Sequence, residues 1–122
     1  MKLTKNFSRN EFECNCGCEM PDFVLSNIKE LAENLQVIRD EVGRLDLTNA
    51  YRCRSHNRDI GSGDTSQHIL GKAADIKSKK LSVKELSEAI EDLIKAELIQ
   101  QGGLGTYNTF THYDIRKTKA RW

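Results

Sequence analysis

The chain of 122 residues lacks any run of eighteen apolar residues, so its sequence predicts no membrane insertion. Its first residues also lack the apolar stretch of a secretory signal, and we therefore expect synthesis in the cytoplasm without a signal peptide. The formal net charge is only +1, and no basic block stands out. This weak charge argues against a nucleic-acid partner. The basic residues 116–121 are expected to form a solvated terminus.

Hydrophobic residues make up 38% of the chain and charged residues 30%, as is typical of a soluble globular protein. A chain of this length can bury one core, so we expect a single domain over residues 1–122. Residues 1–20 are predicted to form an irregular, cysteine-bearing N-terminal segment. A capping-box pattern from Ser8 to Glu11 predicts a short helix that begins at Arg9.

Two segments show apolar residues at helical spacing. The first predicts a helix over residues 23–42, with Asp22 as its N-cap and Gly43 at its end. The second predicts a helix over residues 83–98, capped by Ser82. Each helix has one apolar face, so each is expected to cover a sheet.

Four segments are expected to form strands. Alternating side chains predict a strand over residues 45–52, and a polar loop over 54–65 follows it. A short strand is expected within residues 71–76, and two final strands over 103–107 and 110–115. The order helix, strand, strand, helix, strand, strand predicts an α+β fold with helices packed on a small antiparallel sheet.

Histidine is scarce, with only three in the chain. His68 precedes Asp75 by seven positions, with Gly71 between them for a tight turn, and His112 follows in a later segment. Two imidazoles and one carboxylate suit Zn²⁺ and leave a position open for water, which is typical of catalytic zinc. The alternative is that both histidines are ordinary surface or core residues.

On the strand predicted around His112, Asp114 lies two residues further on and shares its face. Asp114 is therefore a candidate general base, or a residue that orients a neighbouring group. The alternative is a carboxylate in an ion pair with Arg116. The third histidine, His56, is a second candidate for proton transfer, although an ordinary loop histidine is the simpler interpretation.

Two further residues are candidates for substrate binding. The guanidinium of Arg52 would suit a free carboxylate, although an exposed arginine without a role is the simpler interpretation. Ser66 is a candidate either to cap the turn before His68 or to donate a hydrogen bond to substrate.

The four cysteines of the chain are Cys14, Cys16, Cys18 and Cys53. Three interpretations remain open: a second, structural zinc ion, a disulfide that ties the N-terminal segment to the segment around Cys53, or thiols without a partner. The Cys-x-Cys-x-Cys spacing departs from the usual Cys-x-x-Cys of zinc sites.

These motifs together resemble the zinc D-Ala-D-Ala carboxypeptidases, in the wider group that includes lysostaphin-type peptidases and the hedgehog signalling domain. The resemblance is carried by Ser66-x-His68-x-x-Gly71-x-Ala73-x-Asp75, by Tyr51-Arg52 and by His112-x-Asp114. The opening Asn6-Phe7-Ser8-Arg9-Asn10-Glu11-Phe12 and the closing Arg121-Trp122 resemble the short phage and bacterial members.

The resemblance implies a zinc ion held by His68, Asp75 and His112, which would polarise a peptide carbonyl and activate water. Arg52 would hold the C-terminal carboxylate of the substrate or stabilise the oxyanion. The substrates would be stem or cross-link peptides of peptidoglycan. We expect a monomer that acts at the bacterial cell wall, in the manner of an endolysin, after phage-mediated release.

One position departs from the family. Related enzymes often carry a Glu or Asp three residues before the last zinc histidine, and this chain has Thr109 there. Asp114 is the replacement that the sequence offers. The missing acid leaves an alternative open, a catalytically silent zinc-containing module that binds the cell wall or forms part of a virion.

Overall fold

The computed structural model describes residues 1–15, 17–53, 61 and 66–122, and it confirms the predicted α+β class. All strands form one sheet in the order β1-β2-β4-β3-β5. Neighbouring strands are antiparallel except at the β3–β5 edge, which is parallel. The elements are η1 (Arg9–Phe12), α1 (Asp22–Val42), β1 (Leu45–Asn49), β2 (Ala73–Ser78), α3 (Val83–Lys95), β3 (Gly103–Thr106), β4 (Thr111–Asp114) and β5 (Ala120–Arg121).

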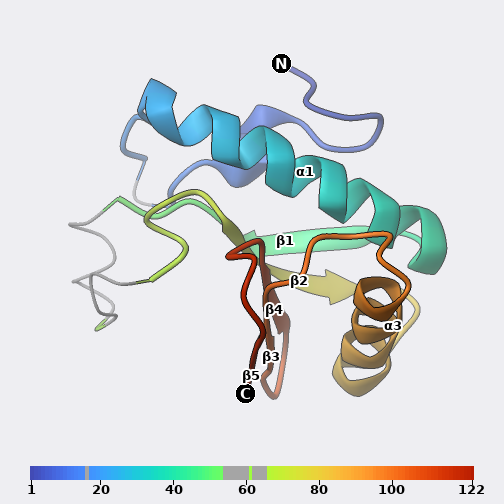
Figure 1. The fold of residues 1–122 in the computed structure, drawn as a ribbon. Helices are drawn as coiled ribbons and strands as arrows, with labels where there is room; N and C mark the ends of the chain where they lie inside the picture. Colours follow the sequence, from blue (N-terminus) through green and yellow to red (C-terminus); the bar gives the residue numbers. More distant parts are fainter. Residues whose placement is uncertain (16, 54–60, 62–65) are drawn as a thin grey trace.

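The two faces of the sheet carry different kinds of residue, because successive side chains of a strand point to opposite faces. The helices α1 and α3 both contact the sheet and each other (Figure 1). Buried apolar residues alternate along the central strands to form the core with these helices. They are Ala74, Ile76, Leu104, Tyr113 and Ile115. The residues between them, on the other face, are mostly polar or glycine.

The helices begin and end close to the predicted residues. The capping box of α3 forms as expected: the Ser82 hydroxyl accepts from the Glu85 amide, and the Glu85 carboxylate accepts from the Ser82 amide. Gly43 ends α1 with a φ of 88°. The prediction that Asp22 caps α1 is wrong, because Pro21 occupies that position and Asp22 is the first helical residue.

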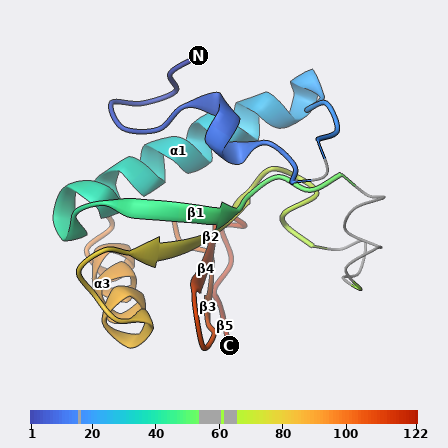
Figure 2. The ribbon, with the colours of Figure 1, turned by 180° about the vertical axis from the view of Figure 1, so that it is seen from behind.

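β1 is shorter than predicted and ends at Asn49 instead of residue 52. Its register with β2 shifts between Leu47 and Asn49, which turns the chain out of the sheet. Beyond this point the Tyr51 amide donates to the Phe12 carbonyl, and the N-terminal segment lies beside β1 and α1 (Figure 2). The end of β1 is therefore fixed by the N-terminal segment.

The expectation of a solvated basic terminus is wrong for part of residues 116–121. Ala120 and Arg121 form β5 beside β3, and Arg121 makes two hydrogen bonds of 2.8 Å to the Glu91 carboxylate on α3. A two-residue strand has no recognisable pattern in the sequence.

None of the helices in the described ranges is long and apolar enough to cross a membrane.

Gly71 offers a test of the turn before β2. Its φ is +72°, and a Cβ at this position would collide with the Val24 side chain of α1. We expect Gly71→Ala to lower the free energy of unfolding by about 2–4 kcal/mol, from backbone strain and overpacking together. Urea unfolding followed by circular dichroism measures this loss.

Gly61→Ala is the matched control. Gly61 has a φ of +80°, but no described atom lies within 4 Å of the added Cβ. Gly61→Ala should lower the free energy of unfolding only by the backbone strain, about 1 kcal/mol. Equal losses from both variants would show that contact with α1 does not restrict the turn.

Candidate metal centre

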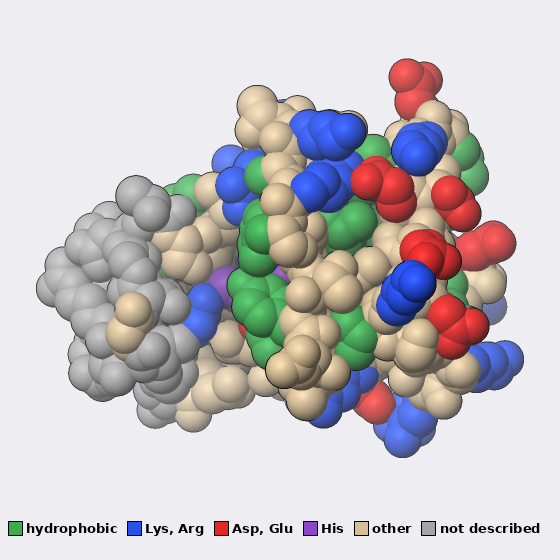
Figure 3. All heavy atoms as spheres, turned by 90° about the horizontal axis from the view of Figure 1, so that it is seen from below, with side chains coloured by type: hydrophobic (Ala, Val, Ile, Leu, Met, Phe, Trp, Pro, Cys, Tyr) green, Lys and Arg blue, Asp and Glu red, His purple; other side chains and the backbone are tan. Residues whose placement is uncertain are grey.

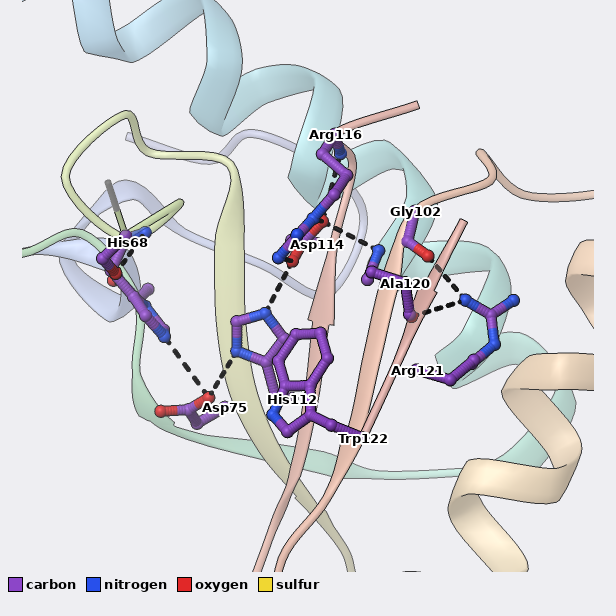
Figure 4. A network of polar contacts seen from close by, with 12 residues as sticks. His68, Asp75, Gly102, His112, Asp114, Arg116, Ala120, Arg121 and Trp122 are labelled. Atoms are coloured by element: carbon purple, nitrogen blue, oxygen red, sulfur yellow. Dashed lines mark hydrogen bonds and ion pairs between the residues drawn. The ribbon is translucent and has the colours of Figure 1, made fainter. Parts of the chain in front are cut away.

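The site is built on the face of the sheet opposite the core. In the β2–β4 pair Asp75 lies directly opposite His112, and Ala73 lies opposite Asp114. Directly opposed residues of antiparallel strands have their Cβ atoms about 5 Å apart, so the side chains of Asp75 and His112 meet. The Asp75 Oδ1 atom lies 3.2 Å from His112 Nδ1 (Figure 4).

His68 reaches the same carboxylate from the turn that leads into β2. Its Nδ1 lies 2.6 Å from the Ala50 carbonyl oxygen, which can only accept, so this nitrogen carries the proton. In the neutral imidazole Nε2 then keeps its lone pair, and this atom lies 3.4 Å from Asp75 Oδ1. The turn is held by the Ser66 hydroxyl, which accepts from the His68 amide.

His112 is oriented by a second carboxylate. Its Nε2 lies 2.7 Å from Asp114 Oδ2, so the Nδ1 atom faces Asp75. Burial opposes the charged form of His112, but hydrogen bonds to Asp114 and Asp75 outweigh it and raise its pKa. For Asp75, burial favours the neutral acid, but hydrogen bonds from His112 and His68 hold its pKa well below the usual range.

The spacing of the three ligand atoms fits a zinc ion. Two ligand atoms at about 2.0 Å from a tetrahedral zinc lie about 3.3 Å from each other. The distances from Asp75 Oδ1 to the two imidazole nitrogens, 3.4 and 3.2 Å, match this value. All three residues are buried, and their ligand atoms lie within 4.8 Å of one another. The donor set and its geometry therefore fit the metal that the sequence implied.

Asp114 lies behind His112 rather than beside the ligand atoms. It is fully buried, and its oxygens accept hydrogen bonds from His112, from the Gly103 amide and from the Arg116 guanidinium. Burial is outweighed by these bonds, which hold the pKa of Asp114 well below the usual range. Both the ion pair with Arg116 and the orienting role considered from the sequence agree with this geometry, whereas the role of general base stays a prediction.

Two glycines of β3 make room on this face. A Cβ at Gly103 would collide with the Asp114 carboxylate, and a Cβ at Gly105 would collide with the Trp122 ring. The indole of Trp122 lies against the His112 imidazole, with ring centroids 4.9 Å apart (Figure 4). The Gly-x-Gly spacing in a strand was a sequence signal for this close packing.

A cleft of about 460 Å³ opens over the ligand atoms. Figure 3 shows histidine atoms at this hollow, beside hydrophobic and basic side chains. The cleft is lined by Arg52, Ser66, Gln67, His68, Asp75, Tyr107, Phe110, His112, Arg116 and Trp122.

Arg52 lines this cleft together with Arg116, and the expectation of an ordinary exposed arginine is wrong for Arg52. It is only 7% exposed, and its terminal NH2 group donates to the Ser66 hydroxyl at 3.3 Å. Its buried Nε makes no hydrogen bond to any described residue. Burial lowers its pKa, and the charges of Asp75 and Cys14 oppose this effect. A buried guanidinium that lines a cleft is suited to an anionic ligand.

Aromatic residues form one wall of the cleft, which the sequence-based predictions largely missed. The rings of Tyr107 and Phe110 stack with centroids 4.5 Å apart, and the Trp122 indole donates to the Tyr107 hydroxyl at 2.7 Å. The Arg116 guanidinium lies 5.3 Å from the Trp122 ring centre. Phe110 lies two residues before His112, so the two-residue period of a strand could have indicated that it shares the face of His112. Nothing in the sequence indicates that the chain terminus returns to this face.

Two candidates cannot be placed, because Cys16 and His56 lie outside the described residues. The other three cysteines, Cys14, Cys18 and Cys53, lie close together, with their sulfur atoms within 4.8 Å of one another. Thr109 lies at another pocket, with Asn108 and Val83, and does not line the cleft.

Fold and site together define the class of protein: an α+β domain with two imidazoles and one carboxylate that can hold a metal ion and that open to a cleft. The Peptidase M15 family profile matches residues 5–114, and the chain belongs to this family. Membership supports a zinc-dependent peptidase and agrees with the three-ligand site. No curated protein matches the sequence closely enough to serve as a relative.

The geometry of Asp114 separates two roles experimentally. A residue that orients a metal-bound histidine typically affects metal affinity by about 10–100-fold when it is replaced. We expect Asp114→Asn to lose affinity to this extent, measured by competition with a chelator, and to retain most of its peptide cleavage once saturated with metal. If Asp114 were the general base, its replacement would instead lower the rate of cleavage by about 10²–10⁴-fold in the metal-saturated protein.

The pH dependence gives a second readout of the same variant. Asp114 raises the pKa of His112, and protons compete with metal for the imidazole. In Asp114→Asn the pKa of His112 should fall. As the pH is lowered, the variant should therefore begin to lose its metal affinity at a lower pH than the parent does. Asp46→Asn, which removes a surface carboxylate 3.3 Å from Arg44, is the control and should change neither readout.

Proposed function

We propose that this protein is a zinc metallopeptidase that hydrolyses peptidoglycan peptides next to a free C-terminal carboxylate. The observation that carries the proposal is the buried Arg52 guanidinium in the cleft of the metal ligands. A carboxypeptidase must recognise the terminal carboxylate of its substrate, and an arginine fork matches that group. This favours a D-Ala-D-Ala carboxypeptidase over an endopeptidase.

The positions of the charges support a defined substrate orientation. Arg52 and the ligand set line the same cleft, so a terminal carboxylate on Arg52 would bring a nearby peptide bond toward the ligand atoms. Zinc, when bound, would polarise the carbonyl and activate a water molecule as the nucleophile. Ser66 steadies Arg52, and the aromatic wall of Tyr107, Phe110 and Trp122 would limit access of bulk water.

The stem and cross-link peptides of the cell wall are the substrate class that the resemblance implies. The cleft is polar at Arg52 and apolar at the wall formed by Phe110 and Trp122, which suits a short peptide with a charged end. We accordingly place the action of the protein at the bacterial wall, reached after phage-mediated release.

A second candidate function is a catalytically silent module that binds zinc and wall peptides. It is favoured by one observation: among the described residues lining the cleft, Asp75 is the only one with a carboxylate side chain, and it belongs to the ligand set. Thr109, where relatives often carry an acid, faces another pocket. Such a module would hold peptides in the same cleft without turnover.

The test is mass spectrometry of a synthetic stem pentapeptide ending in D-Ala-D-Ala, incubated with the zinc-loaded protein. We expect release of the terminal residue from the free acid and much slower release from the C-terminal amide, which cannot pair with Arg52. A parent protein that binds zinc and peptide but cleaves neither substrate would support the silent module instead.

Arg52→Gln tests the carboxylate interaction directly. Hydrogen bonds to charged groups contribute about 1.5–3 kcal/mol, so kcat/KM for the free acid should fall about 10–100-fold while zinc content is unchanged. The matched control is Arg44→Gln, an exposed arginine outside the cleft, which should keep parental activity. An equal fall in kcat/KM for the amide substrate would show that Arg52 does not bind the terminal carboxylate.

A further inference from the structure

Three cysteine sulfurs gather at a point that the proposed peptidase chemistry does not use. The Sγ atoms of Cys14, Cys18 and Cys53 all lie within 4.8 Å of one another. Cys14 is buried, and the other two are partly buried. They come from segments about 35 residues apart, so the fold rather than local sequence brings them together.

The sulfur spacing is that of ligands around one ion. Cys14 Sγ and Cys53 Sγ lie 3.9 Å apart, far beyond the S–S bond of about 2.05 Å in a disulfide. Thiolates at about 2.3 Å from a tetrahedral zinc lie about 3.8 Å from one another. The pair is thus placed for a shared metal ion and not for a bond to each other.

The backbone around the cluster is held independently of the sulfurs. The Gly17 amide donates to the Cys14 carbonyl at 3.0 Å, and Gly17 has a φ of +82°, which favours glycine. The Tyr51 amide donates to the Phe12 carbonyl, and the Asn15 side chain donates to the Thr48 carbonyl. These contacts dock both sulfur-bearing segments side by side.

We propose that Cys14, Cys18 and Cys53 bind a second, structural metal ion of the zinc type, separate from the ion of the peptidase site. Three or more thiolates select a thiophilic ion, whereas the imidazoles and carboxylate of the other site do not require one.

The consequence of this ion lies in the position of Arg52. Cys53 is the next residue along the chain, and Arg52 projects into the peptidase cleft. Binding of the ion would add a link between the N-terminal segment and Cys53 to these backbone contacts and so further restrict the backbone of Arg52. The ion therefore positions a substrate-binding residue without contacting substrate.

Metal stoichiometry tests the proposal independently of peptidase activity. We expect about two zinc ions per chain in the parent, one in His112→Ala and one in Cys53→Ser. After cobalt substitution, His112→Ala should retain a thiolate-to-cobalt charge-transfer band in the near ultraviolet, and Cys53→Ser should lose it. The His112→Ala protein keeps every cysteine, so this arm does not depend on the folding of a cysteine variant.

Several outcomes would overturn the second site. They are a parent with one metal per chain, a His112→Ala protein without metal or thiolate band, a Cys14–Cys53 disulfide in the purified protein, and the visible absorption of an iron–sulfur cluster. Failure of the peptidase proposal looks different, because the thiolate band would remain while stem peptides stay uncleaved.

If the ion positions Arg52, Cys53→Ser should raise KM more than it lowers kcat, and Ser26→Ala, a surface control, should change neither.

Discussion

The pairing of β2 with β4 is the constraint on which the rest of the site depends. It places Asp75 opposite His112 and Ala73 opposite Asp114, so one register fixes a ligand pair and the carboxylate that orients it. A shift by one residue would turn all these side chains toward the core. The apolar residues on the other face, such as Ile76 and Tyr113, oppose that shift because they would lose their burial under the helices.

The charges of the site form a continuous series from the buried Asp75 through His112 and Asp114 to the partly exposed Arg116. Each group has a partner of opposite charge or a hydrogen-bond donor, which offsets the cost of burial. Removal of one member would leave its neighbour uncompensated. This series holds the His112 ring in one orientation and leaves Nδ1 facing Asp75, and a metal ion can replace the proton there.

Much of this arrangement could be predicted from the sequence. The ligand residues His68, Asp75 and His112 stood out because histidine is scarce and the two-residue strand period places Asp114 on the face of His112. That period cannot distinguish a base that faces the cleft from an orienting residue behind the ring. The distinction depends on Gly103, whose missing side chain leaves the space that Asp114 fills.

Other features depend on contacts between distant segments and had no local signal. The burial of Arg52 follows from the shift in β1 and from the amide of Tyr51, which pairs with the N-terminal segment. The return of Trp122 to the cleft follows from a two-residue strand, too short to be recognised by pattern.

The central claim is that the fold presents His68 Nε2, Asp75 Oδ1 and His112 Nδ1 to one zinc ion. Anomalous diffraction at the zinc edge, from crystals of the zinc-loaded protein, tests this claim most directly. The account predicts an ion at bonding distance from these three atoms, with Asp114 on the far side of the His112 ring. An ion bound through His112 Nε2, or directly by Asp114, would contradict it.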